Sequence, residues 1–384
     1  MKVDLGLRLQ RDKLIGEWLE KIGLAIFILT FWWPNGFYLG GDATFLGNFH
    51  SELEVVFPVC GIGIFLIFFG KFLSGTQNHL SKNQLLFLLS FLGFSALAAV
   101  FSVRPEVSIL FLIIWATGFL SLSFGDSLII KGLEKRFLLF LSLLIGVFLQ
   151  KVFPALGISA ILLGIGALLG IIFAMKDKEF RGRFLLILFY TWIVFETAHL
   201  GLILLAFLML FGAKFWLPRA MKNVQKELFI PLIFLIGLSV WGIFQGNFRF
   251  GVSWGLPLKF FQEFQTLLFG AGEGQFLIAL QDVSKNILLP ENFWVPSSGF
   301  LLALSEKGFL GIFFLGLLCL LPFIVSDKKK ILFSFLFLYL LFFTSDLIAT
   351  ENGILFLSAF LLATEKNGRY ENGVGKIISK IFQE

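Results

Sequence analysis

Residues 158–175 read ISAILLGIGALLGIIFAM, and the eight residues that follow, 176–183, read KDKEFRGR. The first stretch has no charged residue and approaches the roughly 20 apolar residues that cross a bilayer core. The second stretch carries four Lys and Arg residues, and such clusters beside an apolar run mark the cytoplasmic side of a membrane helix. We therefore predict a transmembrane helix near residues 156–175 whose C-terminal end faces the cytoplasm.

The same alternation continues through the whole chain. Of its 384 residues, 58% are apolar and only 15% are charged, against about 25% charged in soluble domains. This composition excludes a soluble globule and a disordered chain. A disulfide scaffold is excluded because Cys60 and Cys319 are the only cysteines and both lie in apolar runs. We predict an all-α fold, a polytopic bundle of transmembrane helices forming a single integral membrane domain over residues 1–384.

Apolar runs predict about twelve spans. They lie near residues 21–34, 54–70, 84–101, 107–124, 137–153, 156–175, 184–197, 200–213, 228–245, 300–325, 331–346 and 352–364. Residues 184–213 are divided into two spans because both flanks are basic, with a turn outside at Glu196-Thr197-Ala198-His199.

The basic residues orient these spans. With the N-terminus in the cytoplasm, 25 of the 31 Lys and Arg residues fall on the inner side. We therefore predict a protein of the cytoplasmic membrane with both termini inside and a cytoplasmic tail at residues 365–384. The net charge of +6 belongs to this pattern and does not indicate a nucleic-acid partner. Six basic residues are left outside: Arg104, Lys151, Arg249, Lys259, Lys285 and Lys307.

One outer loop, residues 246–298, is much longer than the others, and such loops usually carry function. Apolar residues at helical spacing from Phe260 to Leu268 predict a helix that lies on the membrane surface. Arginines on the outer rim, Arg249 and Arg104, suit the pyrophosphate of a lipid-linked sugar, or act as interfacial anchors.

Two segments of this region resemble the O-antigen ligase/polymerase family. Residues 267–276, LLFGAGEGQF, look like that family's LLGVGxGNF, and residues 296–311, PSSGFLLALSEKGFLG, are similar to its HNxxLxxLxExGxxG. Upstream, Arg249 and Trp254 resemble its RxxxW segment with one additional residue between them, and residues 101–105, which include Arg104, resemble a turn common there.

The resemblance implies transfer of a glycan from an undecaprenyl-type pyrophosphate carrier to an acceptor hydroxyl outside the cytoplasmic membrane. The acceptor would be a glycan, a lipid or a protein, and the reaction would use no cofactor and no metal. Membrane lipids would surround the protein, and no nucleic acid would be bound. By the same resemblance, the substrate-binding residues would be Arg249, Arg104, Trp254, Gly270 and Gly272.

The chain departs from the family pattern at three positions. Ser297-Ser298 stands where the family usually has His-Asn, Ala198-His199 where it has Ser-Arg, and Asp346 where some relatives carry an Asp-His pair. A serine hydroxyl orients a substrate but does not act as a general base near neutral pH. The predicted catalytic residues are therefore His199, Ser297, Ser298 and Asp346. Either His199 or Asp346 acts as the base, or positioning and charge stabilisation suffice without one, or the chain is a weak or inactive relative. If His199 functions, it and Arg249 are predicted to lie within about 10–12 Å in one cleft.

Two other functions remain open from the sequence: a transporter or flippase of lipid-linked glycan, and an inactive relative that only binds it. A transporter predicts internal repeats and interrupted helices with polar groups at mid-bilayer, whereas the spans here are almost purely apolar. This contrast favours the transferase. Glu306 and Gly308 are predicted to be structural, the glycine allowing close approach of a neighbouring helix.

Overall fold

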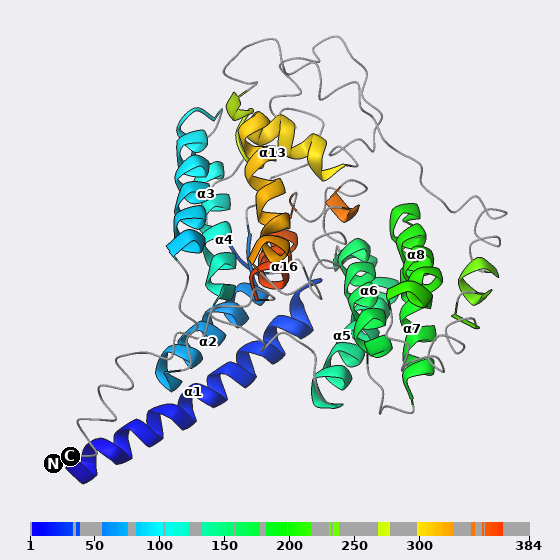
Figure 1. Ribbon diagram of the computed structural model, residues 1–384, viewed down its shortest axis with the longest axis horizontal. Helices are drawn as coiled ribbons and strands as arrows, with labels where there is room; N and C mark the ends of the chain where they lie inside the picture. Colours follow the sequence, from blue (N-terminus) through cyan, green and yellow to red (C-terminus); the bar gives the residue numbers. More distant parts are fainter. Residues whose placement is uncertain are drawn as a thin grey trace.

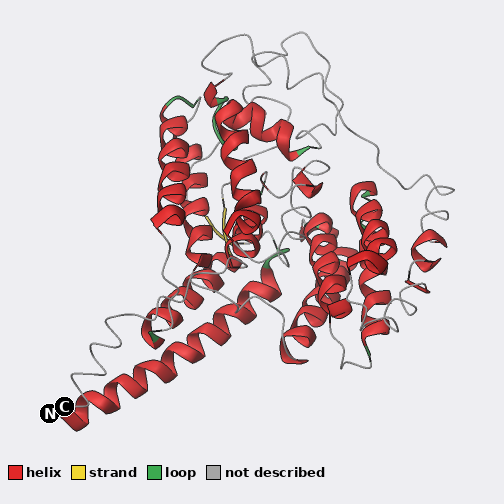
Figure 2. Ribbon diagram, in the orientation of Figure 1, coloured by secondary structure: helices red, strands yellow, loops and turns green. Residues whose placement is uncertain are grey.

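The computed structural model describes a protein that is mostly helical (Figure 2). The described residues are 2–33, 36–38, 56–75, 82–102, 105–122, 133–156, 158–176, 182–197, 199–216, 230–231, 233–237, 268–276, 298–325, 339–341, 348 and 350–363.

The long helices fall on the apolar runs of the sequence. They are α1 (Lys2–Thr30), α2 (Val59–Ser74), α3 (Lys82–Val100), α4 (Pro105–Phe119), α5 (Leu133–Val152), α6 (Ala160–Lys176), α7 (Arg183–Glu196), α8 (Leu200–Trp216), α13 (Gly299–Val325) and α16 (Glu351–Ala363). A short 3-10 helix, η2 (Pro154–Leu156), joins α5 to α6. Strands β1 (Gly36–Tyr38) and β2 (Val56–Pro58) pair antiparallel, with Phe37 opposite Phe57.

The helical class is confirmed for the described residues, and the twelve-span bundle is not. Two stretches, Pro105–Leu122 and Gly299–Cys319, are long and apolar enough to cross a membrane by length and composition. Four shorter apolar helices are Val59–Ser74, Leu85–Val100, Ala160–Met175 and Gly201–Phe211. The predicted spans near 228–245 and 331–346, the surface helix and the tail lie mostly or wholly outside the described residues.

The first helix begins earlier than the prediction near residue 21. Its 29 residues start at Lys2 and give a length of about 43 Å at 1.5 Å per residue. The added part is rich in Leu, Arg, Lys and Glu, which are good helix formers, so the polar stretch continues the apolar helix instead of forming a loop.

Glycines join α1 to α2 in an antiparallel pair. A Cβ added to Gly16 would lie 2.5 Å from the Gly70 oxygen, and one added to Gly23 would lie 2.6 Å from the Gly63 oxygen. The two backbones are therefore in direct contact, as small residues allow between membrane helices. The pair ends at lower left in Figure 1, where the N-terminus lies.

The other helices form two groups that meet at the C-terminal end of α1 (Figure 1). One group contains α3, α4, α13 and α16, and the other contains α5, α6, α7 and α8. Just after α1, Phe31 packs on Phe356 of α16 with ring centroids 4.9 Å apart, and Trp32 Nε1 donates to Ser142 Oγ of α5 at 2.8 Å. These contacts join both groups into one hydrophobic core.

Helix ends that the charge pattern assigns to the outer side lie together. Lys151 at the end of α5 forms a 2.9 Å ion pair with Glu196 at the end of α7. Asn352 at the start of α16 donates through Nδ2 to the carbonyl of Trp33, just after α1, at 2.6 Å. Each contact joins two helix ends that the charge pattern predicts on one side, and the sidedness itself stays a prediction.

Candidate functional site

Helix α13 is interrupted at Gly308, and a loop occupies the break. Gly308 has φ 65° and ψ −166°, a conformation that residues with a Cβ rarely adopt. Such a break removes the usual helical donors from the carbonyl groups before it. The N–H groups of Ala271 and Gly272 take their place, donating to the carbonyls of Ser305 and Glu306, both at 2.9 Å.

Two glycines allow this loop, residues 268–276, to lie directly against α13. Gly270 has φ 73°, and a Cβ there would collide with the backbone of Glu306. A Cβ on Gly308 would in turn collide with the backbone of Leu268. The close approach predicted for Gly308 is therefore present, and its partner is the start of segment 268–276, where Leu268 and Phe269 are helical.

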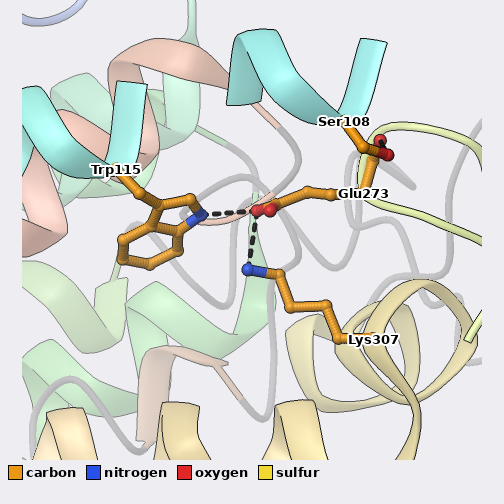
Figure 3. Close-up of polar contacts among 4 residues, drawn as sticks. All are labelled: Ser108, Trp115, Glu273 and Lys307. Atoms are coloured by element: carbon orange, nitrogen blue, oxygen red, sulfur yellow. Dashed lines mark hydrogen bonds and ion pairs between the residues drawn. The ribbon is translucent and has the colours of Figure 1, made fainter. Parts of the chain in front are cut away.

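A buried carboxylate stands at the centre of the docked loop (Figure 3). Glu273 Oε1 lies 2.8 Å from Lys307 Nζ and accepts a hydrogen bond of 2.5 Å from Trp115 Nε1 of α4. The Glu273 and Lys307 side chains are only 6% and 7% exposed, and Trp115 is fully buried. Three segments far apart in the sequence thus meet at one carboxylate oxygen.

The ammonium group of Lys307 lies between aromatic rings. Its Nζ is 4.7 Å from the ring centroid of Trp115 and 5.1 Å from that of Phe91 on α3. Cation–π attraction therefore supplements the ion pair, which brings the charges together without a well-directed hydrogen bond. Both effects are strongest away from water, where this lysine lies.

Further hydrogen bonds fix the rest of the loop. Ser108 Oγ of α4 donates to the Glu273 carbonyl at 3.3 Å and accepts from Gln275 Nε2 at 2.9 Å. Glu306 Oε1 accepts the N–H of Phe276 at 3.2 Å, and the Glu306 side chain is also buried. We call Glu273, Glu306 and Lys307 the ionic cluster. Because it is buried, the cluster can hold a loop or exchange a proton, whereas a glycan would have to bind outside it.

Of the predicted catalytic residues, Ser298 is buried at the start of α13. Its carbonyl accepts the N–H of Leu302 at 3.0 Å, as the residue that caps a helix does. Its hydroxyl donates to the carbonyl of Leu341 at 3.5 Å. In this structure Ser298 therefore joins α13 to the helical residues 339–341.

His199 lies between α7 and α8, which are separate helices as predicted. Its carbonyl accepts the N–H groups of Leu202 and Ile203, at 3.1 and 3.2 Å. Its own N–H donates to Thr197 Oγ1 at 3.3 Å. The residue is half-buried and belongs to the α5–α8 group, whereas Ser298 and the ionic cluster belong to the α3–α4–α13 group (Figure 1).

Two of the five predicted substrate-binding residues lie within the described ranges. Gly270 and Gly272 are described, and both pack against protein: a Cβ on Gly272 would collide with Ser102. Five predicted site residues lie outside the described ranges: Arg104, Arg249, Trp254, Ser297 and Asp346. The cleft shared by His199 and Arg249 therefore stays a prediction.

Sequence reasoning did not assign a role to Lys307, Trp115, Ser108 or Gln275. One signal was available, because Glu306 and Lys307 interrupt an apolar run, and charges in such runs are paired or functional by default. The partner of Lys307, however, is Glu273 on a loop more than thirty residues away, and no local pattern connects the two.

Comparisons with known proteins give no further assignment. Neither protein-family models, nor curated proteins, nor solved structures match this chain.

Proposed function

We propose that this protein is a polytopic transferase of the cytoplasmic membrane, similar to the O-antigen ligase/polymerase family. It would move a glycan from an undecaprenyl-type pyrophosphate carrier to an acceptor hydroxyl on the outer side. One observation carries the proposal: the two segments that resemble the family pack against each other. Their backbones are joined by the hydrogen bonds from Ala271 to Ser305 and from Gly272 to Glu306.

The membrane setting is supported by apolar side chains on the surface of the described helices. In water, large exposed apolar surfaces are unfavourable, whereas in lipid they are the normal exterior. The proposal includes twelve spans with both termini in the cytoplasm. Examples of the exposed side chains are Leu86 and Leu89 on α3, Phe137 and Phe148 on α5, Phe211 on α8, and Phe309 and Phe313 on α13.

The proposed chemistry is an inverting substitution at the anomeric carbon. The acceptor oxygen forms a bond to that carbon, the bond to the carrier's pyrophosphate breaks, and the acceptor proton passes to His199 or Asp346. Arg249 and Arg104 hold the departing pyrophosphate, because paired guanidinium donors match phosphate oxygens. Ser297 orients the acceptor, and the loop docked on α13 supports this face of the protein.

Replacing Arg249 tests the transferase. If Arg249 binds pyrophosphate with two donors, Arg249→Lys keeps the charge but loses one charge-assisted hydrogen bond, worth about 1.5–3 kcal/mol. Transfer should fall roughly ten- to a hundredfold. The measurement is formation of the glycan–acceptor product in membrane vesicles supplied with the lipid-linked donor.

The matched control is Arg11→Lys. The Arg11 side chain is 74% exposed, and it precedes the first predicted span, on the side of the membrane opposite to Arg249. It should transfer like the wild type. Unchanged transfer in Arg249→Lys would instead assign Arg249 to anchoring at the membrane interface.

A second function, transport of the lipid-linked glycan, is favoured by the interruption of α13. Interrupted helices with charged groups at the break are typical of secondary transporters, and Glu306 and Lys307 directly precede Gly308. The two functions separate in vesicles without acceptor: a flippase moves the donor across the bilayer, and a transferase leaves it in place. A relative that only binds would do neither and would still retain the donor.

A further inference from the structure

The ionic cluster has an unequal number of charges. Glu273, Glu306 and Lys307 are each 6% exposed, and they bring two carboxyl groups and one ammonium group together. Among the described residues, Glu273 and Lys307 are the charged side chains that act on Glu306. The described part of α3 facing them, residues 85–100, has no charged residue, and Glu106 on α4 is exposed. With every group ionised, the described residues would leave one negative charge of the cluster buried without compensation.

The two carboxyl groups are not equivalent. Glu273 Oε1 receives both the ammonium of Lys307 and the indole N–H of Trp115, which together stabilise an anion. The donors to the Glu306 carboxyl among the described residues are neutral backbone N–H groups, that of Phe276 on Oε1 and that of Gly274. An uncompensated charge in apolar surroundings is strongly unfavourable, and a carboxyl group avoids it by keeping its proton.

We propose that the ionic cluster binds one proton, held on Glu306, and that this proton keeps loop 268–276 docked in the break of α13. When the proton leaves, two carboxylates face one ammonium group away from water. The repulsion between the two carboxylates is relieved when the loop undocks and one of them becomes hydrated. The inference rests on the described contacts alone and holds for a transferase and for a transporter alike.

Coupling to one proton gives opening of the loop a defined pH dependence. The docked state holds a proton that the open state releases above the pH at which a hydrated glutamic acid ionises. The equilibrium constant for opening therefore rises about tenfold per pH unit in that range. Docking is favoured at low pH and lost as the pH rises.

A cysteine in the loop measures this opening. Ala271 is 4% exposed and its N–H is bonded to Ser305, so a thiol placed by Ala271→Cys is shielded while the loop is docked. The chain without this substitution gives the background, because Cys60 and Cys319 are both fully buried. The measurement is the rate of labelling by a hydrophilic maleimide across a pH series in detergent micelles.

The matched variant carries Ala271→Cys together with Glu306→Gln, which imitates the protonated glutamic acid. Thiol ionisation affects both proteins equally. The labelling rate of Ala271→Cys divided by that of Ala271→Cys/Glu306→Gln therefore isolates the effect of the proton on Glu306. That ratio should rise about tenfold per pH unit. Identical pH profiles in the two proteins would overturn the proposal.

Infrared spectroscopy provides a measurement that needs no folded Glu306→Gln protein. At neutral pH the wild type should show the carbonyl stretch of a buried protonated carboxyl group. Glu273→Gln should lose that band, because Glu306 then ionises to pair with Lys307. Absence of the band in the wild type, or its persistence in Glu273→Gln, would overturn the proposal, and neither readout depends on glycan transfer.

Discussion

At the scale of single residues, replacement of Lys307 should lower the stability of the protein more than replacement of its partner Glu273. Lys307→Met would leave Glu273 buried with only the Trp115 hydrogen bond, and an uncompensated buried charge lowers stability by about 3–5 kcal/mol. Glu273→Gln should be milder, because the carboxyl group of Glu306 can ionise and pair with Lys307. Thermal unfolding in detergent, followed by tryptophan fluorescence, measures both.

The double variant Glu273→Gln/Lys307→Met is the control for this pair. It contains no unpaired charge at the ion pair, so its stability should recover most of what Lys307→Met loses. Additive losses in the double variant would mean that the two side chains do not form a coupled pair.

At the scale of elements, the contact between α1 and α2 depends on the absence of side chains along its glycine seam. A Cβ on Gly63 would lie 2.6 Å from the Gly23 oxygen and 2.8 Å from the Phe27 nitrogen, so the helices would have to separate. Gly63→Ala should destabilise the protein by about 1–3 kcal/mol, the usual effect of overpacking. The midpoint of thermal unfolding reports the change.

Gly93→Ala is the matched substitution within α3, where an added Cβ meets no atom within 4 Å. It should be neutral or raise stability by up to about 1 kcal/mol, because alanine favours a helix interior over glycine. Equal losses at Gly63 and Gly93 would contradict a role for direct backbone contact between α1 and α2.

At the scale of the whole molecule, the distribution of basic residues predicts the topology. Reporter fusions at Glu291, in the long outer loop, and at Lys329, in a basic inner segment, should report opposite sides of the membrane. The ion pair between Lys151 and Glu196 joins two helix ends predicted to be outside, so a fusion at Phe153 should agree with Glu291. Glu291 and Lys329 on the same side would contradict the twelve-span arrangement.

For the described helices other than α1, the sequence by itself predicted roughly where they lie, because an apolar run is a local property. Helix α6, for example, ends at Lys176, one residue after the predicted end of its span. The same locality explains the error at α1, whose polar first half has no signal in hydropathy and yet continues a helix from Lys2.

Only the tertiary structure determines that the residues of the ionic cluster lie together. The sequence shows Glu273 in a glycine-rich turn and Lys307 in an apolar run, but not that Gly308 interrupts α13 and leaves carbonyl groups that the turn satisfies. Helix formation depends on neighbours within a few residues, whereas a buried charge is stable only beside its partner. That partner is brought close by the packing of α4, the loop and α13 together, and no stretch of sequence contains it.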